Sequence, residues 1–499
     1  MTELIDTFYG RIKGTYNDGV YRFLGIPYAK APLGELRFRD PQAPDPWDGV
    51  IKADKYPKNP IQKYKDMDFH YLSEDCLYMN LWVPKHGEEK LPVMLWVPGG
   101  AYAGGGSGIN SEGERCIYDG SILAKDTGCI IITISYRLNV FGFLNLSEYS
   151  SRFDDNLGIK DIIAALKWVH KTIAAFGGDA GSVTLFGQSA GAGAISALLL
   201  VDEVQPYFHK AIIQSNCFGS FYTVEEEEEI TAKFLEILQI KKADAQAMLE
   251  VSYPQLMQAA DELDQYVTKH YFGRCTFCPV VDGVLIKEFP TLASFQKAKK
   301  PVMVGSNHEE GNFLTLERKW TKKQRDQLKD SLLRRLDEQK RREILERYPG
   351  LPSKQAFSDL LTDVMYTIPK LWFAEHYSQE GTVYVYRYDY SPFVMKLLGL
   401  RACHIAELFV LYELYKVKPY HILFLGSKRT AGDLGRRLRK YWGAFARSGD
   451  PNAAGLAQWK PYQEKDRYTM IFHRNDRLVA DADQKNRQWY LTILKLLIS

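Results

Sequence analysis

The chain has 499 residues, of which 45% are hydrophobic and 25% are charged, a composition typical of a globular protein with material for a large core. Its 64 basic and 61 acidic residues leave a formal net charge of +3. Both signs are interspersed, so the composition gives no indication of a surface for nucleic acid or an anionic membrane. Length alone suggests about three domains, but no linker or repeat divides the sequence. We therefore expect one large domain over residues 1–499.

Residues 1–19 carry early acidic residues and no apolar core of signal-peptide length, and no apolar stretch elsewhere approaches the roughly 20 residues of a membrane helix. We expect a cytoplasmic protein without a membrane partner. Cys275 and Cys278 form an isolated C-x-x-C with no second ligand pair, so packed thiols are expected there instead of a zinc or redox site. The odd total of seven cysteines predicts reduced thiols. They are Cys76, Cys116, Cys129, Cys217, Cys275, Cys278 and Cys403.

Apolar runs of strand length alternate with helical segments along the chain. The helical pattern over residues 159–176 has apolar residues at three- and four-residue spacing. Several strands are apolar on both faces, as in central strands covered by helices on each side. The alternation predicts an α/β protein with a mostly parallel sheet, whose reactive groups lie on loops at the carboxyl ends of the strands. The predicted strands are residues 91–97, 129–136, 182–186, 210–215, 301–306 and 383–390.

Small residues follow the first of these strands directly, at Gly99, Gly100 and Ala101. Small side chains let backbone N–H groups approach a negatively charged oxygen, so this loop is a candidate oxyanion hole for acyl transfer. A phosphate cradle is not favoured, because no Gly-Lys-Ser/Thr follows the glycines. A flexible surface loop is the alternative.

The segment Val183 to Gly191, VTLFGQSAG, leads from a strand through G-Q-S-A-G into a helix-forming sequence. That order of elements is typical of a nucleophile elbow, in which a serine stands on a tight turn between strand and helix. The flanking glycines, Gly187 and Gly191, are expected because a larger side chain would collide with neighbouring backbone. Ser189 is the candidate nucleophile, and the N–H of Ala190 is the other expected oxyanion donor. An ordinary Gly/Ser turn is the alternative.

Two helical insertions are expected at approximately residues 223–270 and 315–380. The run of glutamates after Val224 opens the first, with Thr223 as its N-terminal cap. Residues 320–348 are dense in alternating charge with periodic leucines. They predict a solvated pair of helices that covers the sheet, and a partner-binding role is the less favoured reading.

Several long motifs resemble the type-B carboxylesterase family, which includes carboxylesterases, bacterial para-nitrobenzyl esterases and cholinesterases. The resemblance covers nearly the whole chain and implies an α/β-hydrolase fold with helical insertions. It implies a serine carboxylesterase that hydrolyses carboxylic esters through an acyl-enzyme. The motifs are YRFLGIPYAKAPLGELRF near the start, SEDCLYMNLWVP from Ser73, FGGDAGSVTLFGQSAG from Phe176, NHEEG from Asn307 and HIAELF from His404.

A serine nucleophile needs an imidazole base and a carboxylate that orients it, and in this fold the chain order is Ser, acid, His. Spacing does not choose between His376, His404, His421 and His473, but the family motif implies His404. Likewise Glu309 and Glu310 both follow a strand, and the family pattern of glutamate before glycine implies Glu310. Ser215 matches a family serine that hydrogen-bonds near the triad.

The resemblance implies no metal or organic cofactor and a small-molecule ester as the partner of a monomer or small homo-oligomer. Gln188 precedes the nucleophile where cholinesterases and many relatives carry glutamate, and no tryptophan lies between Asp54 and Asn80, so a choline ester is not expected. Cys76 lacks the upstream partner with which secreted relatives form a disulfide. Pro98 replaces the usual His or Tyr before the oxyanion glycines. Short- to medium-chain esters are the expected substrates; a lipase-like hydrolase and a non-catalytic binding protein are the alternatives.

Overall fold

Eleven strands form one sheet in the order β18-β17-β16-β15-β12-β11-β9-β10-β8-β4-β3 in the computed structural model. The model describes residues 3–62, 69–85, 87–108, 116–216, 220–271, 273–289, 299–334 and 336–487. Strands from β17 to β10 pair in parallel, and both edges are antiparallel. The strands are β3 (Thr15–Asn17), β4 (Val20–Pro27), β8 (Tyr78–Pro84), β9 (Leu91–Val97), β10 (Ile130–Ile134), β11 (Gly178–Gln188), β12 (Lys210–Gln214), β15 (Val302–Asn307), β16 (Val383–Tyr388), β17 (Tyr468–Phe472) and β18 (Arg477–Ala480).

The central strands are buried on both faces because successive side chains enter two different apolar clusters. In β9, Val93 and Leu95 belong to the cluster on one face, whereas Met94 and Trp96 belong to the cluster on the other. Neither face meets water, so the sequence shows a continuous apolar run instead of alternation. This is the arrangement that the sequence predicted for its central strands.

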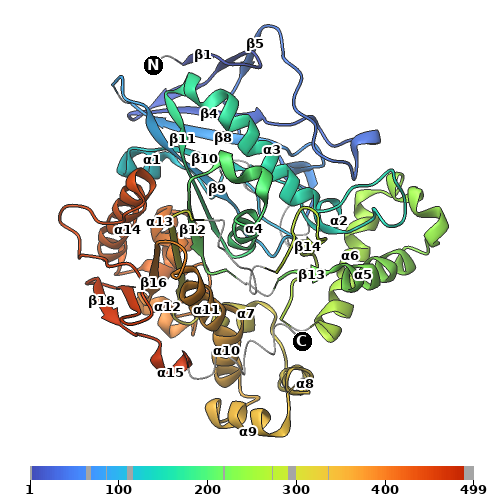
Figure 1. Ribbon diagram of the computed structural model, residues 1–499, viewed down its shortest axis with the longest axis vertical. Coiled ribbons are helices and arrows are strands. Elements are labelled where there is room, and N and C mark those ends of the chain that lie inside the picture. The colour runs from blue at the N-terminus through green and yellow to red at the C-terminus, as the bar shows by residue number, and fades with distance from the viewer. Residues whose placement is uncertain are drawn as a thin grey trace.

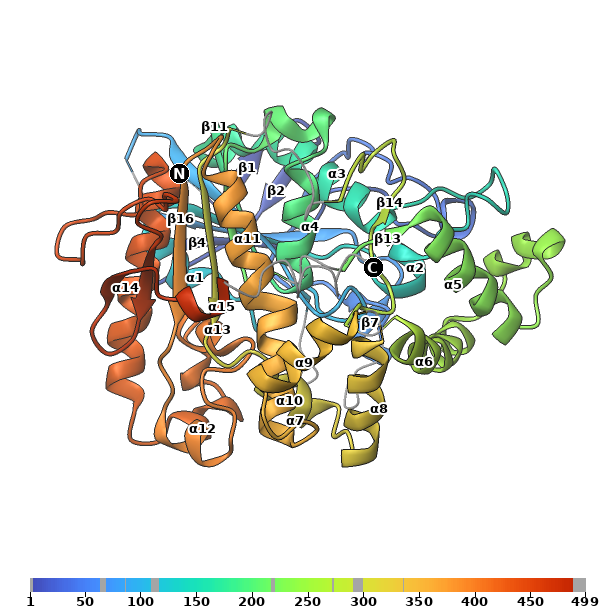
Figure 2. The same ribbon diagram turned by 60° about the horizontal axis from the view of Figure 1, so that its bottom comes forward.

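Helices cover each face of the sheet (Figures 1 and 2). The cluster on the first face includes apolar side chains of α3 (Leu157–Thr172), α4 (Ala190–Leu198) and α11 (Ile368–Tyr377). The second face is covered by α1 (Ser121–Thr127), α13 (Ala406–Leu411) and α14 (Lys428–Ser448). The fold is thus an α/β-hydrolase sandwich with a largely parallel centre. The remaining short elements are α2 (Asn139–Phe143), α7 (Gly311–Glu317), α12 (Phe393–Leu397), α15 (Gln484–Arg487), β1 (Leu4–Asp6), β2 (Arg11–Lys13), β5 (Val50–Lys52), β6 (Asn59–Pro60), β7 (Leu72–Ser73), β13 (Tyr222–Thr223) and β14 (Val280–Val281).

The first helical segment beyond the sheet contains α5 (Val224–Ile237) and α6 (Tyr253–His270). Thr223 caps α5 as predicted: its Oγ accepts the Glu226 N–H at 3.1 Å, and the Glu226 carboxylate accepts the Thr223 N–H at 3.0 Å. Acidic residues follow in the first turn, where they complement the helix dipole. The glutamate run is therefore explained by local helix chemistry.

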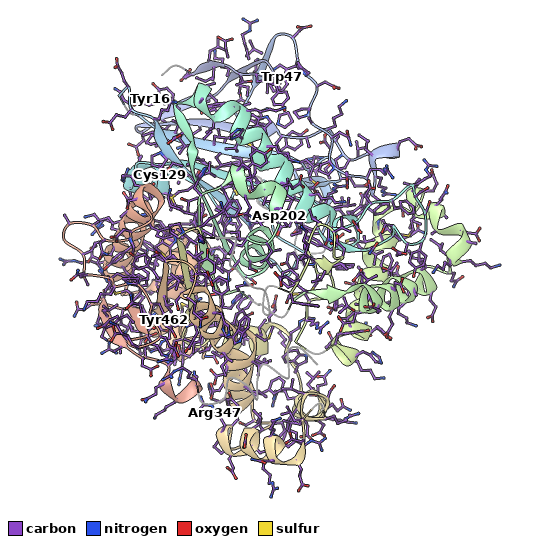
Figure 3. The ribbon with its side chains drawn as sticks, viewed as in Figure 1. Tyr16, Trp47, Cys129, Asp202, Arg347 and Tyr462 are labelled. Carbon is purple, nitrogen blue, oxygen red and sulfur yellow. The ribbon has the colours of Figure 1, made fainter. Side chains whose placement is uncertain are left out.

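The second helical segment contains α8 (Lys322–Leu333), α9 (Glu338–Arg347) and α10 (Lys354–Thr362). The predicted helix pair over residues 320–348 exists as α8 and α9. Its expected position over the sheet is wrong, because its leucines pack with α10 in a separate apolar cluster. Tyr348 and Arg347, the latter labelled in Figure 3, both donate to Asp363, at 2.7 and 3.3 Å. These bonds tie the end of α9 to the π-helical segment Asp363–Thr367, which leads into α11.

All six predicted strands are present; β9 has the predicted bounds, and the other five differ by at most four residues at either end. The sequence did not predict β3 and β18, which form the two edges of the sheet, or β4 and β8, which pair antiparallel inside it. β3 and β18 have no buried residue, so their apolar signal is weak. Within the described residues, no helix combines the length and hydropathy that a membrane crossing needs.

Candidate active site

Ser189 stands on a sharp turn between β11 and α4. Its backbone has φ 57° and ψ −126°, a conformation that costs a non-glycine residue free energy and persists only where the surroundings fix it. A Cβ on Gly191 would lie 2.0 Å from the Val97 carbonyl oxygen, and one on Gly187 would lie 2.8 Å from the same atom. These close approaches explain both glycines, as the sequence predicted. The serine side chain is partly exposed at the carboxyl edge of the sheet.

The loop after β9 lies against this turn. A Cβ on Gly99 would meet the Gln188 carbonyl oxygen at 2.4 Å and the Ser189 Cβ at 3.0 Å, so the two backbones touch. Gly100 has φ 124° and Ala101 has φ 53°, which turns the chain sharply beside the serine. The N–H of Ala190 belongs to the first turn of α4, where amides have no partner within the helix. Gly99 therefore brings the loop that carries Gly100 and Ala101 against Ser189, and Ala190 follows the serine directly in the chain.

Pro98 does not disorder this loop, because side chains from elsewhere in the fold hold it. The Tyr136 hydroxyl donates to the Pro98 carbonyl oxygen at 2.8 Å. The Gln62 amide donates to the Gly105 carbonyl oxygen at 2.7 Å and accepts the Gly105 N–H at 2.8 Å. Sequence reasoning missed both Tyr136 and Gln62, because neither lies in a motif that signals its long-range partner.

Glu310 and His404 meet behind the turn although 94 residues separate them in the chain. The His404 Nδ1 lies 2.5 Å from the Glu310 Oε2, and the Glu310 side chain is fully buried. The other carboxyl oxygen accepts the Ser215 hydroxyl and the Asn307 N–H, both at 2.6 Å. With three donors on its two oxygens, the buried carboxyl group is held in one orientation.

Gln188 connects the serine turn to the imidazole. Its side-chain nitrogen lies 3.0 Å from the His404 Nε2, and the residue is 2% exposed. With the Nδ1 proton directed at Glu310, Nε2 is an acceptor, so the glutamine amide donates to it. An uncharged group thus occupies the position that faces the imidazole beside the nucleophile.

The structure also distinguishes the candidates that spacing left open. His404 contacts Glu310, whereas His376 stacks on Trp372 and His473 contacts Tyr390. His421 lies in the 3-10 helix Tyr420–Phe424. Glu309 is partly exposed and accepts the Ala402 N–H at 3.1 Å. It therefore fixes the segment that carries His404, beyond the solvated role expected for it.

A second buried acid lies behind the first. Glu407 accepts the Gln214 amide and the Tyr386 hydroxyl, both at 3.0 Å. Burial, together with the nearby charge of Glu310, raises the pKa of Glu407 to about 8. Nothing in the sequence signalled a role for Glu407. It lies three residues after His404, and this pair does not form a metal-binding motif.

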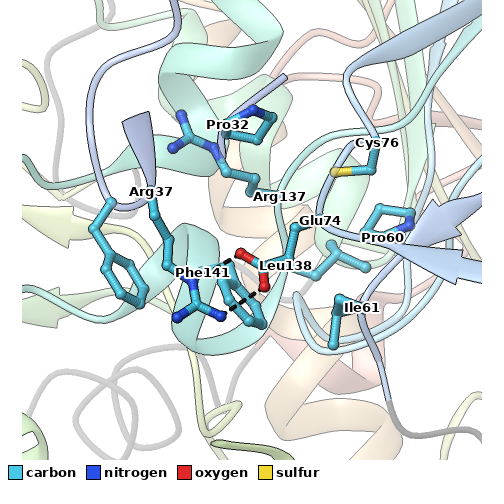
Figure 4. Close-up of a pocket in the computed structure, with 10 residues that line it drawn as sticks. Pro32, Arg37, Pro60, Ile61, Glu74, Cys76, Arg137, Leu138 and Phe141 are labelled. Carbon is cyan, nitrogen blue, oxygen red and sulfur yellow. Dashed lines mark hydrogen bonds and ion pairs between the residues drawn. The ribbon is translucent and has the colours of Figure 1, made fainter. Parts of the chain in front are cut away.

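A small cavity elsewhere contains none of the predicted site residues (Figure 4). Its volume is about 10 Å³, enough for one water at most. The Arg37–Glu74 ion pair, at 2.6 Å, and the Cys76 thiol line it. Burial raises the pKa of this thiol well above its usual value, so it is chemically quiet.

Cysteines and possible metal ligands are further candidates for a second site within the part of the chain that the structure describes. Cys76, Cys116, Cys129, Cys275, Cys278 and Cys403 are free thiols, and Cys217 lies outside the described residues. In the described ranges, no cluster of three His, Cys, Asp or Glu side chains is arranged to hold a metal ion.

An α/β sheet with a strained serine at a strand-to-helix turn, backed by a buried His–carboxyl pair, defines a serine hydrolase of the α/β-hydrolase class. The family model described as "Carboxylesterase family" matches residues 1–490. The chain belongs to this family and is a carboxylic ester hydrolase.

Individual relatives agree. The chain is 33% identical to the para-nitrobenzyl esterase of Bacillus subtilis (strain 168), over 97% of this chain and 98% of the relative. It is 32% identical to human carboxylesterase 5A, over 90% and 81% of the two chains. Among solved structures, a PNB esterase matches with a TM-score of 0.86 at 31% identity, covering 99% of this chain and all of the other. A carboxylesterase of Geobacillus stearothermophilus matches with a TM-score of 0.85 at 32% identity, covering 98% of this chain and all of the other.

Proposed function

We propose that Ser189, His404 and Glu310 hydrolyse short- to medium-chain carboxylic esters through an acyl-enzyme. The observation that carries this proposal is the 2.5 Å contact between Glu310 and His404 Nδ1, which leaves Nε2 as the basic nitrogen next to the serine turn. His404 takes the Ser189 proton as the hydroxyl oxygen attacks the ester carbonyl, and then gives that proton to the departing alcohol. Water repeats both transfers on the acyl-enzyme and releases the acid.

The N–H groups of Gly100, Ala101 and Ala190 stabilise the oxyanion of each tetrahedral intermediate, with each donor lowering the barrier by about 3 kcal/mol. Ser215 holds the Glu310 carboxyl group ready to stabilise the imidazolium. Gln188 orients the imidazole until the substrate aligns the serine hydroxyl with Nε2. No step uses a cofactor.

The uncharged Gln188 beside Ser189 supports neutral esters over cationic choline esters, because it offers no negative charge to a quaternary ammonium. The name of the Bacillus subtilis relative suggests a para-nitrobenzyl ester as a test substrate with a bulky alcohol. A small side chain at Ala101 is consistent with room for such an alcohol.

We further infer one domain over residues 1–499 with helical insertions at approximately 223–270 and 315–380, active in the cytoplasm as a monomer or small homo-oligomer. The separate apolar cluster of α8, α9 and α10 supports the second insertion. The free thiols support a reducing compartment.

The test is steady-state turnover of para-nitrophenyl esters from acetate to dodecanoate, and of a para-nitrobenzyl ester, by the wild-type chain, Ser189→Ala and Ser182→Ala. Ser182 lies on β11, the strand that leads into the Ser189 turn, and is the matched control. We expect a maximum of kcat/KM among the shorter acyl chains, a wild-type rate in Ser182→Ala and a loss of about 10⁵-fold in Ser189→Ala. A rising rate up to dodecanoate would instead favour a lipase, and full turnover by Ser189→Ala would refute the proposal.

A further inference from the structure

Five large apolar side chains project into solvent from two neighbouring segments of the chain. Phe393 and Leu397 on α12 are 71% and 75% exposed, and Leu398 is 53% exposed. Ile422 in the 3-10 helix η9 (Tyr420–Phe424) is 51% exposed, and Leu425 directly after it is 55% exposed. The two elements pack against each other. We call these residues, with the basic side chains around them, the 393–425 surface.

Packing beneath these side chains shows that their exposure is a built feature of the fold. The inward residues Met395 and Phe424 are 1% and 0% exposed and belong to the apolar cluster of the second sheet face. The Phe409 ring lies 5.4 Å from Tyr420 and 5.7 Å from Phe424. The inward-facing side chains are therefore fixed, while the outer apolar side chains remain in water. Soluble proteins rarely expose neighbouring large apolar side chains in this way unless they form a binding surface.

Charge around this row is one-sided. Residues 391–432 contain six Lys and Arg and two Glu, a formal charge of +4, whereas the whole chain carries +3. Neither glutamate presents a free carboxylate to solvent. Glu407 is buried, and Glu413 is 17% exposed and paired with Lys416. Arg401 also lies 4.0 Å from Glu309, outside this segment. The exposed basic residues are Lys396, Arg401, Lys416, Lys418, Lys428 and Arg429.

We propose that the 393–425 surface binds the surface of an anionic lipid bilayer. The apolar row enters the interface, and the basic residues contact the lipid phosphates, the combination by which peripheral proteins bind membranes. A second copy of this chain is a poorer partner, because a symmetric contact would place Lys396, Lys418, Lys428 and Arg429 near the same cations of the other copy. The near-neutral charge of the whole chain gives no sign of this surface, because its basic and apolar residues come together only in the fold.

The position of the surface connects it to the active site. The Leu400 carbonyl oxygen accepts the Asn312 side chain at 3.4 Å, and Ala402 exchanges hydrogen bonds with Glu309 at 2.9 and 3.1 Å. Both contacts flank Glu310, and His404 follows two residues later. Binding at this surface would hold the acid–base side of the site near lipid. That consequence rests on the proposed function, but the binding itself does not.

The experiment is sedimentation of the full chain with vesicles of phosphatidylcholine, with and without phosphatidylglycerol. Phe393→Ser/Leu397→Ser tests the apolar row, with Val284→Ser as control, because Val284 is 81% exposed elsewhere. Lys396→Glu/Lys418→Glu tests the charge, with Lys322→Glu/Lys323→Glu on α8 as control. Thermal melting and turnover of a water-soluble ester check that each variant folds, and Ser189→Ala checks that binding is independent of catalysis.

We expect wild type, both controls and Ser189→Ala to bind phosphatidylglycerol vesicles, and salt to weaken that binding. The apolar double variant should bind about tenfold more weakly, and the charge double variant more weakly by about fivefold for each lysine. Three results would overturn the proposal. They are absence of binding to anionic vesicles, equal binding to neutral vesicles, and a concentration-dependent dimer that Phe393→Ser/Leu397→Ser dissociates.

Discussion

The Ser189 turn and the Glu310–His404 pair meet at Gln188, yet different constraints build them. Backbone atoms hold the turn: Gly191 leaves no room for a Cβ against Val97, and Gly99 touches Ser189. Side-chain hydrogen bonds hold the pair, with Ser215 and the Asn307 N–H fixing the carboxyl group. The turn is therefore sensitive to side-chain volume, whereas the pair is sensitive to charge and hydrogen-bonding capacity.

The sharpest test of the charge-sensitive half is Glu310→Gln, which keeps the volume and removes the charge. An amide does not stabilise the imidazolium and favours the wrong tautomer of His404, so kcat/KM should fall about 10⁴-fold with little loss of folding. Glu309→Gln is the neighbouring control and should retain activity within about threefold, since its amide oxygen still accepts the Ala402 N–H. Equal losses in both variants would contradict the assignment of the acid.

The volume-sensitive half is tested by Gly191→Ala. The new Cβ would lie 2.0 Å from the Val97 carbonyl oxygen, so strand and helix must separate. We expect a loss of unfolding free energy of about 3 kcal/mol or more and a fall in kcat/KM of about 100-fold from the misplaced serine. Gly87→Ala, where nothing lies within 4 Å of the added Cβ, is the control for urea unfolding and activity. Unchanged stability of Gly191→Ala would refute the steric account of the turn.

Gln188 is next to Ser189 in the turn and its side chain contacts His404 of the pair. Its substitution therefore tests how the turn and the pair are connected. Gln188→Glu places a negative charge 3.0 Å from the His404 ring and favours the imidazolium, which is no base. The acid side of the kcat/KM profile should therefore move to higher pH by about one unit. Besides Glu310, the ring faces Tyr366 and Phe313, which bring no charge. A superimposable profile for Gln188→Glu would show that the position does not act through the imidazole.

The smallest effect on activity is expected for Glu407→Gln, whose consequence lies in stability. The pKa of Glu407 is raised from 4.5 to about 8 in the folded protein. The folded state therefore keeps a proton that the unfolded chain loses above pH 4.5. Stability from this group is complete below about pH 4.5 and is lost as pH rises through about 8.

We expect the free energy of unfolding of Glu407→Gln, measured in urea, to rise relative to that of wild type between about pH 5 and pH 9. The total relative change should be on the order of 3 kcal/mol. Glu346→Gln, exposed on α9, controls for the loss of a surface charge. Activity should stay within about twofold. Parallel stability curves for Glu407→Gln and wild type would contradict the account.

Features that depend on neighbouring residues in the chain could be predicted from the sequence. The Gly187–Gly191 turn, the Thr223 cap and the six central strands all have such signals. It could not pair Glu310 with His404 from spacing, because sheet topology joins them, and the choice came from a family resemblance. Gln62 and Tyr136, which hold the Pro98–Gly105 loop, have long-range partners and no motif. The packing partner of α8 and α9 was predicted wrongly, because an amphipathic pattern shows which face of a helix is buried but not which element covers that face.

The proposed mechanism depends on Ser189 as the nucleophile and on His404 as the base that activates it. Labelling the intact chain with a fluorophosphonate, followed by peptide mass spectrometry, tests it most directly, because the reagent reacts with an activated serine. We predict one adduct per chain, on Ser189, and greatly slowed labelling in Glu310→Gln. An adduct on another residue, or unchanged labelling of the intact protein in Ser189→Ala, would contradict the account.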